Sequence, residues 1–144
     1  MFLDSAYLAK FYLNEPDSPK VRHLIQNADS RIVSSEWSIL EVTCAFHRHL
    51  REGQLSAEQH NELLQAFHKH TDDEIWTLVP INRRIVRRSS DVLKTLPAGI
   101  YLRAGDAIQL FSVQEAGESE VWSNDRHLLA AAPHFGITGR RVSD

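Results

Sequence analysis

The chain has 144 residues and only one cysteine, Cys44. A single cysteine excludes an internal disulfide and any zinc site built from several cysteines, and it is usual in a reducing compartment. The sequence also lacks a run of apolar residues near the ~20 that cross a bilayer. Its first residues carry Asp4 within an apolar stretch with no basic segment before it, unlike a signal peptide. We therefore expect a cytoplasmic protein with no membrane role.

Glycine is scarce, with 6 residues, and no glycine-rich phosphate loop is present. The hydrophobic fraction of 42% and charged fraction of 24% are ordinary for a soluble globular protein, and the length suits a single domain over residues 1–144. The net charge of −3 is not that of a protein that binds nucleic acid through bulk positive charge. Two bound divalent cations would bring it to about +1, so a nucleic-acid substrate is not excluded.

Short apolar runs alternate with segments of helical periodicity along the whole chain. The predicted strands cover residues 1–3, 31–34, 75–81 and 120–123, with a last one near 137. The predicted helices cover residues 5–12, 19–28, 35–51, 56–67, 83–96, 104–116 and 125–132. Ser18 is the expected cap of the second helix, and Gly53 is placed to end the third. Strands that alternate with helices predict the α/β class, with a parallel sheet covered on both faces.

Four acidic residues lie where an apolar run meets a helical pattern: Asp4, Glu41, Asp106 and Asp125. Asp4 and Asp125 directly follow predicted strands, and ligands of open α/β sheets bind outside the carboxyl ends of the strands. Glu41 lies on a helix, away from that helix's apolar stripe. Carboxylates gathered in one cleft need a cation between them, and oxygen ligands select Mg²⁺ or Mn²⁺. If the fold brings the four together, the chain is a metal-dependent enzyme.

Each of these features also has a purely structural interpretation. An aspartate between a strand and a helix is often only a helix cap, and a helical glutamate is often solvated. Cys44 has no matched catalytic signature, so we expect a buried structural thiol. Four arginines at 83, 84, 87 and 88 predict a basic helical face, which is either solvated, bound to a partner or in contact with phosphates.

Four segments of the sequence resemble the PIN-domain ribonucleases, and most closely the VapC-like toxins of bacterial and archaeal toxin–antitoxin pairs. They are FLDSAYLAKFYLNEP at 2–16, SSEWSILEVTCA at 34–45, LRAGDAIQL at 102–110 and SNDRHLLAAA at 123–132. The resemblance runs nearly end to end, in the family's order. One departure is Ala6, where many relatives carry serine or asparagine. That change removes a hydrogen bond near Asp4 but no metal ligand.

The resemblance implies a three-layer α/β/α PIN-like domain with a central parallel sheet. It also implies a metal-dependent endoribonuclease that hydrolyses RNA phosphodiester bonds to a 5′-phosphate and a 3′-hydroxyl. The implied cofactor is Mg²⁺ or Mn²⁺, and Lys10 matches a lysine common in the family's first helix. Asp4 and Asp106 are the expected central ligands. The full implied site consists of the catalytic and metal-binding acids Asp4, Glu41, Asp106 and Asp125, accompanied by the hydroxyls of Ser5 and Ser123.

The family also implies partners. Toxins of this type usually form homodimers and are silenced by a VapB-like antitoxin, whose tail enters the active-site groove. DNA binding would then belong to the antitoxin. The helix at 36–52, with Trp37 and Leu40 outside its apolar stripe, offers a surface for such contacts.

Three other interpretations remain open. A PIN-like domain can serve as a catalytically silent binding scaffold. A phosphatase of the haloacid dehalogenase class also places an aspartate after its first strand, but it needs a second acid two residues later, where this chain has Ala6. A receiver domain expects paired acids near the first strand and a lysine after a late strand, and neither is apparent.

Overall fold

The computed structural model describes residues 1–142, in which five strands form one parallel sheet. The sheet order is β3-β2-β1-β4-β5, and every neighbouring pair is parallel. The strands are β1 (Phe2–Leu3), β2 (Ile32–Ser35), β3 (Trp76–Val79), β4 (Glu120–Trp122) and β5 (Thr138–Arg140). The α/β class and the parallel sheet expected from the alternating pattern are confirmed.

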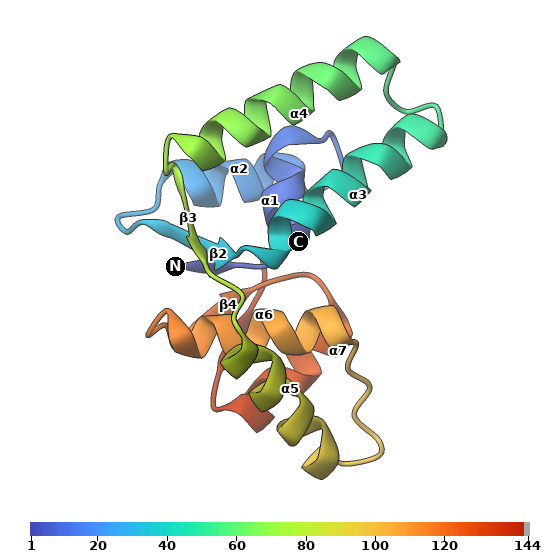
Figure 1. Cartoon of the computed structure of the whole chain (residues 1–144). Helices are drawn as coiled ribbons and strands as arrows, with labels where there is room; N and C mark the ends of the chain where they lie inside the picture. Colours follow the sequence, from blue (N-terminus) through green and yellow to red (C-terminus); the bar gives the residue numbers. More distant parts are fainter. Residues whose placement is uncertain (143–144) are drawn as a thin grey trace.

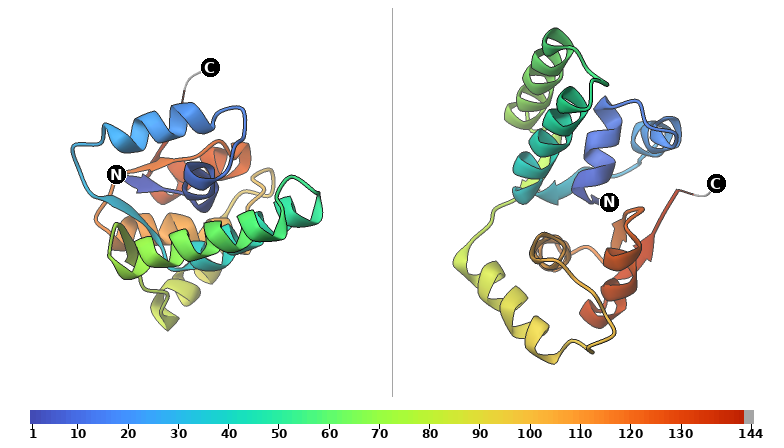
Figure 2. Two further views of the ribbon diagram at one scale, coloured as in Figure 1. Left: turned by 90° about the horizontal axis from the view of Figure 1, so that it is seen from above. Right: turned by 90° about the vertical axis from the view of Figure 1, so that its right-hand side faces the viewer.

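Helices cover both faces of this sheet (Figures 1 and 2). On one face lie α1 (Ser5–Tyr12), α2 (Ser18–Gln26), α3 (Trp37–Arg51) and α4 (Ala57–Asp72). On the other lie α5 (Arg83–Thr95), α6 (Ala104–Glu115), α7 (Arg126–Ala131) and the 3₁₀ turn η1 (Ala132–Phe135). The three-layer α/β/α architecture implied by the resemblance is therefore confirmed.

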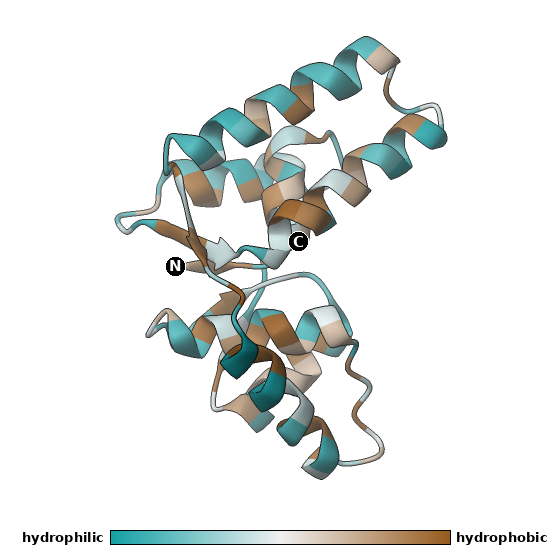
Figure 3. Ribbon diagram, in the orientation of Figure 1, coloured by the Kyte–Doolittle hydropathy of each residue, from teal (hydrophilic) through white to brown (hydrophobic). Residues whose placement is uncertain are grey.

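Two hydrophobic cores form because neighbouring residues of one strand point to opposite faces of the sheet. Leu3 packs into the core under α1 to α4, whereas Phe2 packs into the core against α5 to α7. Both side chains are fully buried, and each contributes ~1.5–3 kcal/mol to folding. The outer faces of α4 and α5 are largely hydrophilic (Figure 3). The central strand therefore anchors both layers, and its carboxyl end is fixed from both sides.

Most helix and strand boundaries fall close to the predicted ones, but the predicted N-terminal cap of the second helix was wrong. Ser18 is the first residue of α2 rather than its cap, and Asp17 occupies the cap position. Ser18 is buried, and its Oγ accepts a hydrogen bond of 2.9 Å from the Glu15 amide. Gly53 follows α3 with a φ of 72°, which agrees with its predicted role as a helix stop.

The four arginines of the predicted basic face are exposed on α5, a helix that packs against α6. Arg84 and Arg88 approach Glu115 of α6 at 3.4 and 3.3 Å. Part of this basic face is therefore used in contacts within the chain. Within residues 1–142, the helices are too short or too polar for any of them to span a membrane.

Candidate active site

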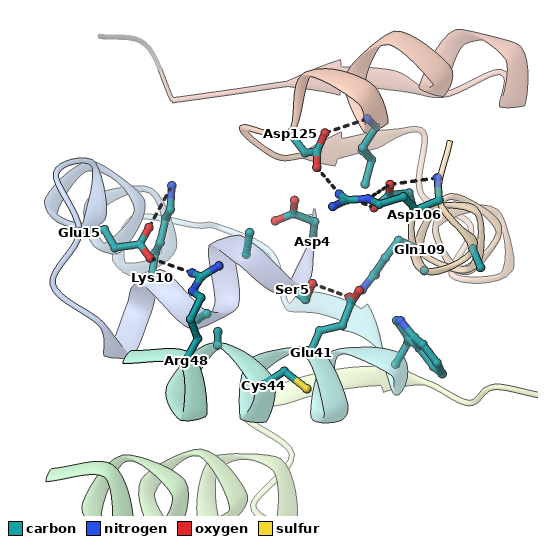
Figure 4. A pocket seen from close by; sticks show the side chains of 18 residues that line it. Asp4, Ser5, Lys10, Glu15, Glu41, Cys44, Arg48, Asp106, Gln109 and Asp125 are labelled. Carbon is teal, nitrogen blue, oxygen red and sulfur yellow. Dashed lines mark hydrogen bonds and ion pairs between the residues drawn. The ribbon is translucent and has the colours of Figure 1, made fainter. Parts of the chain in front are cut away.

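A cleft of about 860 Å³ opens beyond the carboxyl ends of the central strands, between α1 and α3 on one side and α6 and α7 on the other. All four acidic residues singled out in the sequence line it, together with Ser5 and Lys10 (Figure 4). The acids come from four separate stretches of the chain. The parallel topology places them at one edge because β1 lies between β2 and β4.

Asp4 follows β1 directly and begins α1. Its Oδ1 accepts a hydrogen bond of 2.8 Å from the Tyr7 amide, so it is a helix cap as well as a cleft residue. Its Oδ2 accepts a hydrogen bond from the Ser123 hydroxyl at the end of the neighbouring β4. The Asp4 amide donates to the Trp122 carbonyl at 3.1 Å, which ties β1 to β4 at this point. Both carboxylate oxygens are thus oriented by fixed donors.

The Asp4 side chain is costly to ionise. Asp4 is only 4% exposed, and burial raises its pKa from 3.8 to about 7. The Ser123 and Tyr7 hydrogen bonds favour the charged form and lower the pKa, whereas the negative charge of Glu41 raises it further. The carboxyl is therefore partly protonated at neutral pH. A cation placed beside it would favour the ionised form.

Glu41 reaches the cleft from α3, with its carboxylate held by two donors. Its Oε2 accepts hydrogen bonds from Ser5 Oγ at 2.6 Å and from Gln109 Nε2 at 3.1 Å (Figure 4). Apolar residues of α3, including Val42 and Phe46, are fully buried in the core under α1 to α4. The apolar stripe of α3 therefore determines which face Glu41 occupies, and Ser5 and Gln109 determine where its carboxylate lies.

A buried chain of hydroxyl groups sets the orientation of Gln109. Ser34 Oγ donates to the Leu3 carbonyl at 2.8 Å, so the Ser38 hydroxyl must donate to Ser34, which lies 2.8 Å away. Ser38 Oγ then accepts from Gln109 Nε2 at 3.0 Å. With one amide hydrogen directed at Ser38, the other is free to point at Glu41. The end of β1 is in this way linked through three side chains to the position of the Glu41 carboxylate.

Gly105 allows α6 to approach α3 closely. A Cβ atom at this position would lie 2.8 Å from Glu41 Oε1 and 2.9 Å from Trp37 Nε1, which is closer than real Cβ atoms come. Any other residue at 105 would therefore push Glu41 or Trp37 aside. Glycine at the start of α6 makes room for the carboxylate.

Asp106 and Asp125 share one counter-ion, Arg103. Arg103 Nε and Nη2 contact the two oxygens of Asp106 at 2.8 and 3.2 Å, and Nη2 also donates to Asp125 Oδ2 (Figure 4). Asp125 caps α7 by accepting from the His127 amide at 2.7 Å. The hydrogen bonds and negative charge of Asp106 raise the pKa of the Arg103 guanidinium, and Asp125 adds a smaller effect in the same direction. The Arg103 side chain therefore stays charged. One arginine of the same chain is therefore the shared counter-ion of two acids and compensates only part of their charge.

Basic side chains lie on the other side of the cleft. Lys10 Nζ is 2.6 Å from Asp17 Oδ2 and 3.6 Å from Glu15 Oε2. Arg48 is 54% exposed in its side chain and lies 3.9 Å from Glu15 Oε1, too far for a strong ion pair. Figure 4 shows Lys10 and Arg48 across the cleft from Asp106 and Asp125. The acids Glu15 and Asp17 accompany these two basic side chains, so this side of the cleft carries charges of both signs.

Comparison with known families places this site in context. The PIN domain family matches residues 1–133. The chain belongs to the PIN domain family. The match includes all four acids, Ser5 and Ser123, and the resemblance inferred from the sequence is confirmed. That residues 1–144 form a single domain stays a prediction.

Solved structures with the same PIN fold are distant in sequence. VapC20 from Mycobacterium tuberculosis, described as a toxin that cleaves the sarcin–ricin loop, has a TM-score of 0.72 and 11% identity, covering 90% of this chain and 93% of its own. FitAB bound to a DNA fragment has a TM-score of 0.71 and 12% identity, covering 97% and 93%. FitAcB from Neisseria gonorrhoeae has a TM-score of 0.65 and 13% identity, covering 96% and 94%. At these identities the similarity concerns the fold. No curated protein matches the sequence.

The donors in this PIN-domain cleft fit a hard divalent cation. Asp4, Glu41, Asp106 and Asp125 line it, and the buried Gln109 Oε1 has no hydrogen-bond partner among residues 1–142. In the present conformation, the described part of the chain holds no group of three His, Cys, Asp or Glu arranged to bind a metal ion. Arg103 contacts both oxygens of Asp106 and Oδ2 of Asp125. The donor chemistry fits, and those contacts must rearrange for a cation to enter.

Sequence reasoning gave no role to Arg103 or Gln109. The available signals were an arginine three residues before Asp106 and a glutamine three residues after it, both at helical spacing. The prediction for Cys44 was wrong, because its side chain is exposed and lines the cleft. Periodicity showed that Cys44 shares a helix face with Glu41, but that face borders an opening rather than a core.

Proposed function

We propose that this PIN-domain protein is a divalent-metal-dependent endoribonuclease and the toxin of a type II toxin–antitoxin pair. The observation that carries the proposal is the gathering of Asp4, Glu41, Asp106 and Asp125 in one cleft. A protein has little reason to place four acids at one edge of its sheet unless a cation is to bind there. Membership of the PIN family and the shared fold of the toxin VapC20 support the same conclusion.

The four acids would have different roles in metal binding, according to how deeply each is buried. Asp4 and Asp106 are the more buried pair and would be the central ligands, with Glu41 and Asp125 completing the site directly or through water. A divalent cation bound there would lower the pKa of a water molecule and stabilise the charge that develops on the phosphodiester. Asp4 and Glu41 are already oriented by neighbouring donors, which is the usual way that proteins position metal ligands.

Two hydroxyl groups would serve as positioning groups. Ser123 donates to Asp4 and Ser5 donates to Glu41, so neither hydroxyl needs to contact the RNA. Across the cleft, Lys10 and Arg48 can contact phosphates on either side of the scissile bond. The RNA backbone would then lie between the four acids and these two basic side chains.

The proposal is tested by incubating the purified chain with structured and single-stranded RNAs, with and without Mn²⁺. Replacing Asp4 by asparagine removes a proposed ligand but keeps the shape of the side chain. We expect a loss of cleavage greater than the ~10–100-fold that outer-sphere partners of a metal cost. Asp91→Asn is the matched control, because Asp91 is exposed on α5 and contacts Lys94 rather than the cleft. Full activity of the Asp4 variant would refute the assignment.

The same assay separates the alternatives. RNA binding without metal-dependent cleavage would identify a silent scaffold. Release of phosphate from small esters, without cleavage of RNA, would identify a phosphatase.

Two partners belong to the proposal. We infer that a VapB-like antitoxin covers the cleft and that the chain forms a homodimer, both from the resemblance to VapC-like toxins. Exposed apolar side chains offer surface for these contacts, including Leu40 on α3, which is 53% exposed, and Val86 and Leu93 on α5. Sedimentation of the purified chain, alone and with the antitoxin, measures both assemblies.

A further inference from the structure

Arg103 holds an unusual place in the cleft. It comes from the same chain as the acids, and its guanidinium makes a two-point contact with Asp106 and a third contact with Asp125. Asp106 is one of the least exposed acids of the chain, whereas the Arg103 side chain is 54% exposed. The exposed guanidinium of Arg103 therefore covers two carboxylates that are themselves buried or half-buried.

These contacts use the oxygen atoms that a divalent cation would need. Both oxygens of Asp106 and Oδ2 of Asp125 accept hydrogen bonds from the guanidinium. Mg²⁺ approaches carboxylate oxygens to ~2.0–2.1 Å, and it would also meet the positive charge of the arginine. The guanidinium and the cation therefore exclude each other at these oxygens.

The fold allows the Arg103 side chain to leave without disturbing the core. Leu102 packs against the core and fixes the backbone there, whereas Arg103, which precedes α6, has an exposed side chain. Its backbone amide donates to Asp106 Oδ2 at 3.3 Å, which is independent of the side chain. The flexible arginine stem can then turn into solvent while the start of α6 stays in place.

We propose that Arg103 is the internal counter-ion of the cleft and competes with divalent cations for Asp106 and Asp125. This rests on the proposed function, because it assumes that the same acids bind a metal ion. Arg103 would set the cation concentration at which the site fills, since the apparent affinity falls with the fraction of molecules in which the acids are available. It would also prevent two unpaired carboxylates from facing each other in the metal-free protein.

The test is the affinity for Mn²⁺, measured by titration calorimetry on the metal-free full-length chain. If Arg103 blocks the acids in about nine molecules of ten, Arg103→Gln will bind Mn²⁺ about 10-fold more tightly than the unmodified chain. Arg103→Lys keeps the charge but cannot form the two-point contact, so its affinity is expected to lie between the two. Arg126→Gln removes an equal charge next to Asp125 from an exposed side chain and is expected to leave the affinity unchanged.

The outcomes distinguish this inference from the proposed function. If Arg103→Gln binds Mn²⁺ no more tightly than the unmodified chain, or if Arg126→Gln has the same effect, direct competition is refuted. RNA cleavage at saturating Mn²⁺ that depends on Asp4 would still support the nuclease in that case. If none of the chains binds Mn²⁺ and none cleaves RNA, the nuclease proposal fails and the inference fails with it.

Discussion

Replacing Asp4 by asparagine is expected to stabilise the metal-free protein at neutral and alkaline pH, although it removes a helix-capping carboxylate. Asparagine can still accept from the Tyr7 amide through its oxygen and donate to Ser123 through its nitrogen. It removes a buried charge whose pKa is raised from 3.8 to about 7. That rise corresponds to ~4 kcal/mol of unfolding free energy, which is an upper limit because the surroundings relax.

The sign follows from proton linkage. Below pH 4, Asp4 is protonated in both the folded and the unfolded chain. Folding then buries no charge at this position, and the unfolding free energy carries no penalty from Asp4. Between pH 4 and 7 the unfolded chain releases the proton while the folded chain keeps it, so the unfolding free energy of the unmodified protein falls. Above pH 7 the loss is complete. The advantage of the asparagine variant is therefore expected to grow from pH 4 to 7 and then stay constant.

The assay is urea unfolding of both proteins at pH 4 and pH 8 in the presence of a chelator. The quantity of interest is how much the stability difference between the variant and the unmodified protein changes from pH 4 to pH 8. Any effect of the substitution that does not depend on pH cancels in this comparison. Asp91→Asn is an informative control, because the hydrogen bond from Lys94 lowers the pKa of Asp91 and its variant should shift in the opposite direction. A difference for the Asp4 variant that is independent of pH, or largest at pH 4, would refute the buried-charge argument.

Two further substitutions test the groups around Glu41. Gln109→Leu removes both donor contacts of the amide and is expected to lower RNA cleavage by ~10–100-fold while the circular dichroism spectrum is retained; unchanged cleavage would show that Glu41 is positioned without it. Gly105→Ala forces Glu41 or Trp37 to move and is expected to remove most of the activity, with a smaller effect on stability because the crowded Glu41 atom is the end of a flexible side chain. Gly99→Ala is its control, since nothing lies within 4 Å of a Cβ there, and equal effects of the two changes would contradict the packing argument.

Residues that obey simple periodic rules were predictable from sequence. The run before Asp4 and the run before Ser123 could be recognised as strands, and a parallel sheet necessarily brings their carboxyl ends to one edge. The side of α3 that carries Glu41 followed from the apolar stripe on its other side. These local patterns, added to the family resemblance, were enough to indicate the fold and the four acids in the cleft.

Contacts between distant elements were not predictable in this way. The bridge from Arg103 to Asp125 exists because α6 and α7 begin side by side, which depends on the order of strands in the sheet. The hydroxyl chain from β1 to Gln109 likewise requires four elements, β1, β2, α3 and α6, to meet. The prediction that Cys44 is buried was wrong for a related reason. Periodicity gives the direction of a side chain but not whether a core or an opening lies there.

The most direct test of the account is a crystal structure of the protein soaked in Mn²⁺, with anomalous scattering used to locate the metal. We expect a peak within ~2.0–2.4 Å of carboxylate oxygens of Asp4 and Asp106, with the Arg103 guanidinium turned away from Asp106 and Asp125. A crystal at saturating Mn²⁺ with no peak in the cleft, and with Arg103 still bound to both acids, would contradict the central claim.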